Sequence, residues 1–181
     1  AAVGIAPLKE NIAAGLLDIS NWDSSLTLVD PLCGSATFLI EAAAIARGIA
    51  PGLKRSFLFE RWQDFDSHLW DIEKRNAKNL YLANKKLPKI LGIDSNNDIV
   101  NQAKNNIRNA GLTNDIEIHR SDFLDFKLPE STGIIVCNPP YGKRLGNQKE
   151  LEIMYKNFGN YLKQNASGWD LWILNGNSKL S

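Results

Sequence analysis

The chain has 181 residues, of which 44% are hydrophobic and 23% are charged, and its formal net charge is +1. These values fit one globular domain with a sizeable core, and they neither require nor exclude a nucleic-acid partner. No apolar run has the length of a membrane span, no signal peptide is visible, and the two cysteines lie far apart without metal-ligand spacing. We therefore expect a cytoplasmic protein with no membrane contact, no metal and no disulfide. Because the chain starts at Ala1 without methionine, we also expect it to be a portion of a longer protein.

Strands and helices alternate along the sequence. We expect helices opening at residues 7–10 and spanning 37–48, 67–86, 97–110 and 148–164, and strands at 26–29, 89–93, 116–119, 133–137 and 169–174. This alternation predicts an α/β fold with a doubly wound, mostly parallel sheet.

The segment at residues 53–66 is aromatic and irregular, and we expect its rings to cover one end of the sheet. The helix after it is expected to be capped by Ser67. Its predicted apolar positions are Leu69, Ile72, Leu80 and Leu82.

The tetrapeptide Asn138-Pro139-Pro140-Tyr141 follows the apolar strand at 133–137. Asn138 therefore lies at the carboxyl end of a parallel strand, where open α/β sheets bind ligands. Two prolines make a stiff turn with outward-facing carbonyls. An amide oxygen, a rigid carbonyl and an aromatic ring together suit recognition of a planar amine, so we predict chemistry on a nucleobase.

Three aspartates follow successive strands, namely Asp30, Asp94 and Asp122. Strand ends meet at one sheet edge, so we expect these carboxylates to share a cleft that suits a cationic sulfonium cofactor. Asp94 is placed for ribose hydroxyls and Asp122 for an adenine amine, with Phe123 beside the ring. The residues from 30 to 37 form a tight loop that lets a ligand approach, but they lack the complete glycine fingerprint of a nicotinamide dehydrogenase.

Several blocks in fixed order support a resemblance. They are Ala6-Pro-Leu-Lys-Glu10, Asp30-Pro-Leu-Cys-Gly-Ser-Ala-Thr37, Ile40-Glu-Ala-Ala43, Ala50-Pro-Gly-Leu53, Asn138-Pro-Pro-Tyr-Gly142 and Arg144-Leu-Gly146. With them the chain resembles the UPF0020-type methylase domain of S-adenosylmethionine-dependent RNA methyltransferases that carry a THUMP domain. Within that family it is most similar to the bacterial 23S ribosomal RNA guanine-N2 methyltransferases.

The resemblance implies a Rossmann-like class I methyltransferase fold over residues 1–181, with the closing C-terminal hairpin truncated and the THUMP domain absent. It implies S-adenosylmethionine as cofactor and ribosomal RNA as partner. The implied catalytic residues are Asn138, Pro139 and Tyr141. The implied cofactor residues are Asp30, Cys33, Gly34, Ser35, Thr37, Asp94, Asp122, Phe123 and Asn138, and Lys143 and Arg144 adjoin the base site as candidate phosphate contacts. Ala36 stands where the family more often has glycine.

Two alternatives stay open at this point. The tetrapeptide would grip an adenine N6 amine as well as a guanine N2 amine, so an adenine-N6 methyltransferase on DNA or RNA is the first. A non-catalytic cofactor-binding RNA module is the second. A cysteine nucleophile is disfavoured, because Cys137 alternates away from Asn138 along the strand.

Overall fold

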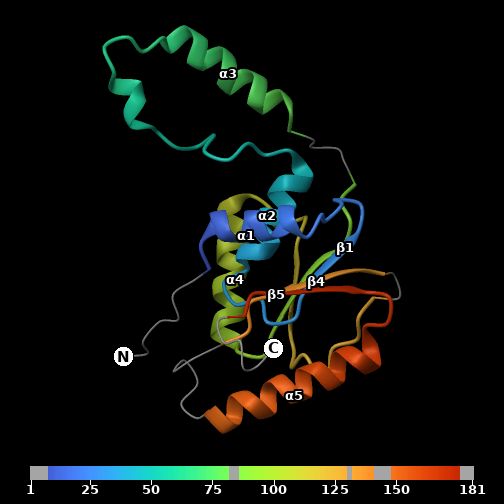
Figure 1. Cartoon of the computed structure of the whole chain (residues 1–181). Coiled ribbons are helices and arrows are strands. Elements are labelled where there is room, and N and C mark those ends of the chain that lie inside the picture. The colour runs from blue at the N-terminus through green and yellow to red at the C-terminus, as the bar shows by residue number, and fades with distance from the viewer. Residues whose placement is uncertain (1–7, 82–85, 130–131, 141–147, 176–181) are drawn as a thin grey trace.

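The computed structural model describes residues 8–81, 86–129, 132–140 and 148–175. Its centre is a five-stranded parallel sheet in the order β3-β2-β1-β4-β5 (Figure 1). The strands are β1 (Thr27–Asp30), β2 (Ile90–Asp94), β3 (Glu117–Arg120), β4 (Gly133–Cys137) and β5 (Asp170–Ile173). This order confirms the doubly wound fold, since the chain turns in opposite directions on the two sides of β1.

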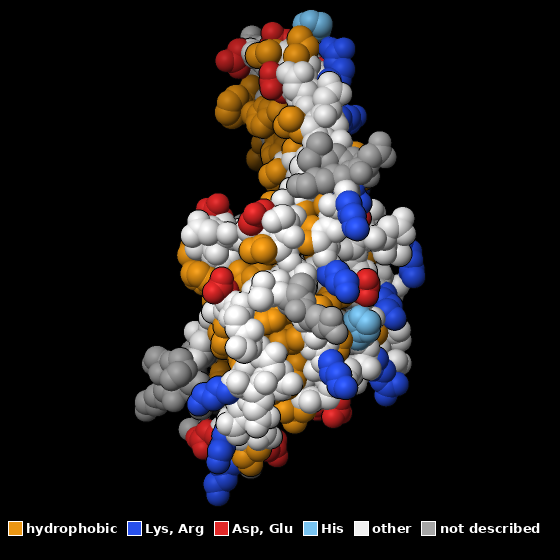
Figure 2. All heavy atoms as spheres, turned by 90° about the vertical axis from the view of Figure 1, so that its right-hand side faces the viewer, with side chains coloured by type: hydrophobic (Ala, Val, Ile, Leu, Met, Phe, Trp, Pro, Cys, Tyr) orange, Lys and Arg blue, Asp and Glu red, His pale blue; other side chains and the backbone are white. Residues whose placement is uncertain are grey.

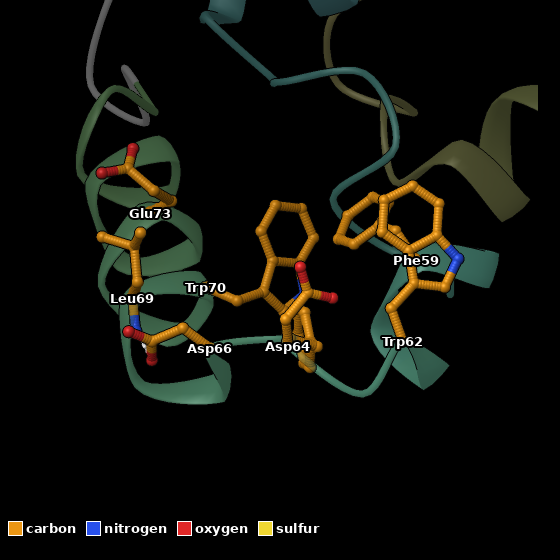
Figure 3. A pocket seen from close by; sticks show the side chains of 8 residues that line it. Phe59, Trp62, Asp64, Asp66, Leu69, Trp70 and Glu73 are labelled. Atoms are coloured by element: carbon orange, nitrogen blue, oxygen red, sulfur yellow. Dashed lines mark hydrogen bonds between the residues drawn. The ribbon is translucent and has the colours of Figure 1, made fainter.

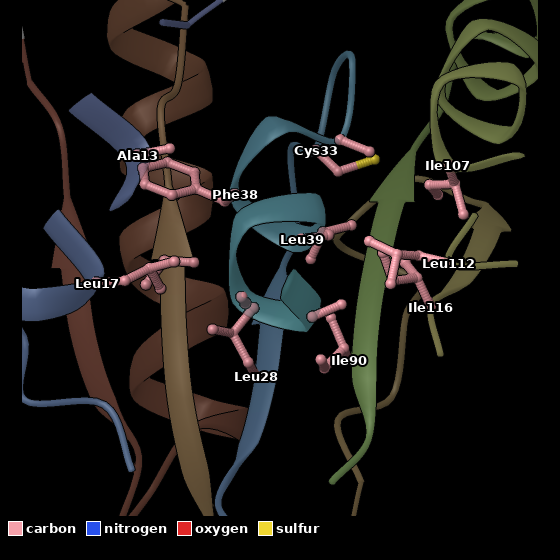
Figure 4. Close-up of a cluster of buried hydrophobic side chains, with 14 of the residues drawn as sticks. Ala13, Leu17, Leu28, Cys33, Phe38, Leu39, Ile90, Ile107, Leu112 and Ile116 are labelled. Carbon is pink, nitrogen blue, oxygen red and sulfur yellow. The ribbon is translucent and has the colours of Figure 1, made fainter. Parts of the chain in front are cut away.

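Helices cover both faces of the sheet (Figure 1). They are α1 (Glu10–Ile19), α2 (Thr37–Arg47), α4 (Asn97–Ala110) and α5 (Gln148–Asn165). Strand side chains alternate between the two layers, as period-two geometry requires. Leu28 and Ile90 pack with α1, α2 and α4 in the larger core (Figure 4), whereas Val29 and Ile135 pack on the opposite face with Leu162 of α5.

The register places the candidate site residues at one edge. Val29 pairs with Leu91 on one side and with Ile135 on the other, so β1 lies between β2 and β4. Asp30 and Asp94 end their strands at this edge, and Asn138 follows the last residue of β4. The carboxyl ends that sequence periodicity predicted to converge are therefore neighbours in the sheet.

A helix from Ser67 is present as predicted, but the prediction that the aromatic segment at residues 53–66 covers one end of the sheet is wrong. The 3₁₀ helix η1 (Leu58–Arg61) and α3 (Ser67–Asn79) project away from the sheet and do not cover its end (Figure 1). Within these two elements, both fully described, no residue is buried. Leu69 is 54% exposed, and Leu80, which follows the last helical residue, is 66% exposed. The rings pack instead on one another, with Phe59 and Trp70 centroids 5.2 Å apart.

The N-cap and the last residue of α3 also differ from the prediction. Its N-cap is Asp66, whose Oδ1 accepts a hydrogen bond from the backbone N–H of Leu69 at 3.0 Å, so Ser67 is the first helical residue. The helix ends at Asn79 and not at residue 86, and Leu82 lies outside the described residues. The resemblance implies a truncated hairpin after β5. Residues 176–181, which follow β5, lie outside the described part of the chain, so this expectation stays a prediction.

Candidate active site at the carboxyl edge of the sheet

Two carboxylates form the centre of the edge. Asp30 is 2% exposed, and its Oδ1 accepts a hydrogen bond from the backbone N–H of Leu32 at 3.1 Å. Burial raises the pKa of Asp30 to about 8, with a smaller contribution from repulsion by Asp94 and partial compensation from the Leu32 hydrogen bond. Burial also raises the pKa of Asp94, whose Oδ1 accepts from the N–H of Asn96 at 2.8 Å. The edge therefore favours a cation that would stabilise the ionised carboxylates.

The loop after Asp30 has an open, strained backbone. Gly34 has φ 53°, and a Cβ built there would meet nothing within 4 Å, so a ligand has free approach to the backbone. Ala36 has φ 67° and is fully buried, a left-handed conformation that normally favours glycine. The backbone N–H of Cys33 donates to the carbonyl of Ile93 at 2.9 Å and ties the loop to β2.

Asn106 of α4 is a site-supporting residue that the sequence did not reveal. Its Nδ2 donates to the carbonyl oxygen of Ser35 at 3.0 Å and so fixes the loop from a helix 71 positions away. The hydroxyls of Ser35 and Thr37 share a hydrogen bond at 3.0 Å. Both residues line a hollow of about 510 Å³ bounded by α1, α2 and α4. Asp30, Asp94 and Asn138 are not among the residues that line this hollow.

Asn138 presents an unpaired oxygen. Its Oδ1 is buried and accepts no hydrogen bond from any described residue, and the side chain of the adjoining Pro139 is fully buried. A buried polar atom without a partner costs free energy, which a ligand N–H would recover. Tyr141, Lys143 and Arg144 lie outside the described residues, so their predicted roles stay predictions.

Asp122 and Phe123 follow β3, the strand beside β2. The Asp122 carboxylate is exposed and accepts from the N–H of Leu124 at 3.0 Å, and the backbone N–H of Ser121 donates to the Asp94 carbonyl at 3.1 Å. Phe123 is only 8% exposed, because its ring meets the edges of Phe158 and Tyr161. An adenine ring could thus reach only the small exposed part of the Phe123 side chain, and its contact there stays a prediction.

Neither cysteine has the surroundings of a nucleophile. Cys33 is 5% exposed, and burial together with Asp30 and Asp94 raises the pKa of its thiol. Cys137 is fully buried beside Phe158 and Tyr161, and burial raises its pKa as well. Raised thiol pKa values disfavour the reactive thiolate, which agrees with the sequence interpretation.

Comparison with known proteins identifies the family. The model of the UPF0020 family, described as an RMKL-like methyltransferase domain, matches residues 1–181. The chain belongs to this family. A ribosomal RNA large subunit methyltransferase K/L from Shewanella frigidimarina is 44% identical over 176 residues, which are 94% of this chain and 25% of the relative. The provisionally named RNA methyltransferase slr0064 from Synechocystis sp. is 39% identical over 181 residues, 99% of this chain and 47% of its own length.

The chain thus spans between a quarter and a half of these relatives. Solved structures match the fold closely. The crystal structure of SMU.472 in complex with S-adenosylhomocysteine (SAH) has a TM-score of 0.90 and 35% identity, covering 98% of this chain and 46% of SMU.472. A Listeria monocytogenes protein described as a predicted N6-adenine-specific DNA methylase has a TM-score of 0.88 and 33% identity. The match covers 99% of this chain and 47% of the Listeria protein. The fold is therefore the Rossmann-like fold of class I methyltransferases.

Among the described residues, no group of three His, Cys, Asp or Glu side chains could hold a metal ion. No helix in the described part of the chain is long and apolar enough to cross a membrane.

Proposed function

We propose that the chain is the catalytic domain of an S-adenosylmethionine-dependent RNA methyltransferase that acts on the N2 amine of a guanine in 23S ribosomal RNA. The observation that carries the proposal is the buried, unpartnered Oδ1 of Asn138 at the sheet edge that also holds Asp30 and Asp94. The names of the K/L relatives support the RNA substrate, and the bound SAH of SMU.472 supports the cofactor.

The residues at the edge fit this cofactor. The carboxylate of Asp94 would accept from the ribose hydroxyls, and the exposed carboxylate of Asp122 from the adenine amine. The loop from residue 30 to 37 would hold the methionine portion, since the space beside Gly34 is open. S-adenosylmethionine supplies an electrophilic methyl group. Its sulfonium charge would stabilise the ionised carboxylates of Asp30 and Asp94, whose pKa values burial raises.

Asn138 would prepare the nucleophile. The exocyclic amine of a purine attacks poorly, because its lone pair is delocalised into the ring. The Asn138 Oδ1 and the Pro139 carbonyl would each accept one amine hydrogen, which favours a tetrahedral nitrogen and aims its lone pair away from these two oxygens, toward the position of the methyl group. Holding the amine in line then contributes several kcal/mol of barrier reduction, about the lower end of measured effective-molarity effects.

The remaining contacts would hold the base and its strand. Tyr141 would stack on the base after it leaves its helix or loop, and Lys143 and Arg144 would contact phosphate. None of the three side chains has to take the proton, since the methylated nitrogen loses it readily to solvent. These roles follow from the position of the three residues directly after Pro140.

The second candidate is adenine-N6 methylation. It is supported by the description of the Listeria protein and by the chemistry of the tetrapeptide, which accepts two hydrogens from either amine. Guanine N2 is preferred because the sequence blocks outside the tetrapeptide resemble those of the bacterial guanine-N2 methyltransferases.

The experiment offers the complete protein and methyl-labelled cofactor to separate pools of ribosomal RNA, transfer RNA and DNA. We expect label in 23S ribosomal RNA and, after digestion to nucleosides, in N2-methylguanosine. Label in N6-methyladenosine would establish the second candidate instead. Label in no pool would contradict both and would favour the non-catalytic module.

A further inference from the structure

The segment from Leu58 to Asn79 forms an aromatic unit of its own, which we call the projecting unit. Phe59 lies at its centre, with ring centroids 5.2 Å from Trp70, 5.9 Å from Phe65 and 6.4 Å from Trp62. Most of these contacts are edge-to-face, the geometry that aromatic pairs prefer. The rings therefore hold η1 against α3 without help from the sheet.

The projecting unit bears an open hollow of about 360 Å³, seen from close by in Figure 3. It is lined by Phe59, Trp62, Asp64, Phe65, Asp66, Leu69, Trp70 and Glu73. Its walls are thus four aromatic rings and one leucine, and its only charged lining groups, all from described residues, are three carboxylates. Figure 3 shows Asp64 between the two indoles, and Glu73 on α3 beyond Leu69.

The hollow lies on an exposed apolar face. Trp62 is 67% exposed and Leu69 is 54% exposed, although both are large hydrophobic residues. In Figure 2, hydrophobic side chains gather on one side of the projecting unit, and Lys and Arg side chains lie along the other side. An exposed apolar concentration of this kind marks an interaction site more often than a passive surface.

We propose that the hollow is a docking site for a protein partner that inserts arginine or lysine from an otherwise apolar segment. The negative charge of the lining carboxylates favours a positively charged side chain as the occupant. Aromatic faces attract cations, and carboxylates beside them pair with guanidinium or ammonium groups. The unit already shows this preference, because Lys74 Nζ lies 5.8 Å from the Trp70 ring centroid and 2.8 Å from Asp71.

RNA is disfavoured as the occupant for the same reason. A nucleic-acid strand brings phosphates, which require lysine or arginine for neutralisation. The described lining offers carboxylates instead, at Asp64, Asp66 and Glu73. The proposed docking site is independent of methyl transfer, which belongs to the sheet edge.

The test titrates the protein by calorimetry with three probes. They are an acetylated hexapeptide alternating arginine and leucine, the same peptide with glutamine in place of arginine, and hexauridine RNA. We expect the arginine peptide to bind at least tenfold more tightly than the other two. Absence of arginine-peptide binding, equal binding of both peptides, or tighter binding of the RNA would each overturn the proposal.

Substitutions of residues that line the hollow test whether the arginine peptide binds there. Trp62→Ala, and separately the pair Asp64→Asn with Glu73→Gln, should weaken arginine-peptide binding at least fivefold. The carboxylate pair should leave the circular dichroism spectrum unchanged, because both side chains are exposed and neither takes part in the ring contacts. Asp71→Asn is the matched control: it removes a carboxylate from the same helix outside the hollow and should leave the affinity unchanged. An Asp71→Asn effect as large as that of the lining pair would mean that only the general charge of α3 matters, and it would overturn the assignment.

Discussion

Asp30 shows how a proposed site residue can act against stability. Its carboxyl group is buried, and its pKa is raised from 3.8 to about 8. Between these values the native protein holds a proton that the unfolded chain releases. The free energy of unfolding therefore falls as the pH rises from about 4 to 8, and the loss is complete above pH 8.

The variant Asp30→Asn tests this residue-scale account. The amide oxygen can still accept from the Leu32 N–H, while the cost of ionising a buried group disappears. We expect melting temperatures of variant and wild type to agree near pH 4 and the variant to gain about 4 °C or more at pH 9, in line with about 2–4 °C per kcal/mol for a domain of this size. Asp122→Asn, on an exposed carboxylate that caps the Leu124 N–H, is the control. A constant offset across the pH range would refute the account.

The sequence predicted the residues at the carboxyl edge of the sheet, but it did not predict the side chain that holds the loop beside them. Asp30, Asp94 and Asn138 could be found because each follows an apolar strand, and parallel topology then brings such positions together. Asn106 could not be found in this way. Its bond to Ser35 depends on which α4 side chain faces the loop, and no local pattern encodes that contact.

At the scale of elements, two glycines with different surroundings make a matched pair. A Cβ added to Gly133 in β4 would collide with the backbone carbonyl oxygen of Thr27 and come within 2.9 Å of Trp169. A Cβ added to Gly159 in α5 would meet nothing within 4 Å. Gly133 therefore permits the close β1–β4 pairing that places Asn138 beside Asp30, whereas Gly159 only loosens a helix.

We accordingly expect Gly133→Ala to lower the free energy of unfolding by about 1–3 kcal/mol, the usual cost of overpacking. Gly159→Ala should raise it by about 0.5–1 kcal/mol, because alanine favours helix over glycine. Urea unfolding followed by circular dichroism measures both. Equal effects of the two substitutions would mean that the β1–β4 contact is not as close as described.

Elements with strong end signals were predicted well, whereas the packing partners of α3 were not. α4 has the predicted bounds, because Asn96 caps its start through two backbone N–H groups and Gly111 ends it at φ 80°. The sequence predicted apolar positions in α3, yet none of its residues is buried, and Trp70 packs against Phe59 in the aromatic segment before the helix. Periodicity indicates which face is covered, but it does not reveal what covers that face.

At the scale of the whole molecule, two regions are spatially separate. The carboxyl edge of the sheet holds the acidic residues and Asn138, whereas the aromatic hollow lies in the projecting unit, which is inserted between α2 and β2 and extends away from the sheet (Figure 1). Alternating strands and helices predicted the doubly wound parallel sheet and hence the edge where the strand ends meet. The position of the projecting unit depends on packing between residues of one insertion, which the pattern of strands and helices does not contain.

The Asn138 oxygen is the proposed activating group, and two variants of the complete protein separate its role from cofactor binding. Asn138→Ala removes the unpartnered acceptor and should lower methyl transfer to RNA by about 10²–10³, as loss of one preorganised polar contact does in other enzymes. Its affinity for SAH should stay within a few-fold of wild type. Asp94→Ala should instead weaken SAH binding strongly, because it removes the proposed ribose acceptor.

Methyl transfer at saturating cofactor, measured for Asn138→Ala alongside its calorimetric affinity for SAH, is therefore the most direct measurement. The account predicts transfer near background with SAH affinity close to that of the wild type. Transfer at the wild-type rate would contradict it, because the amine would then be activated without the oxygen at position 138.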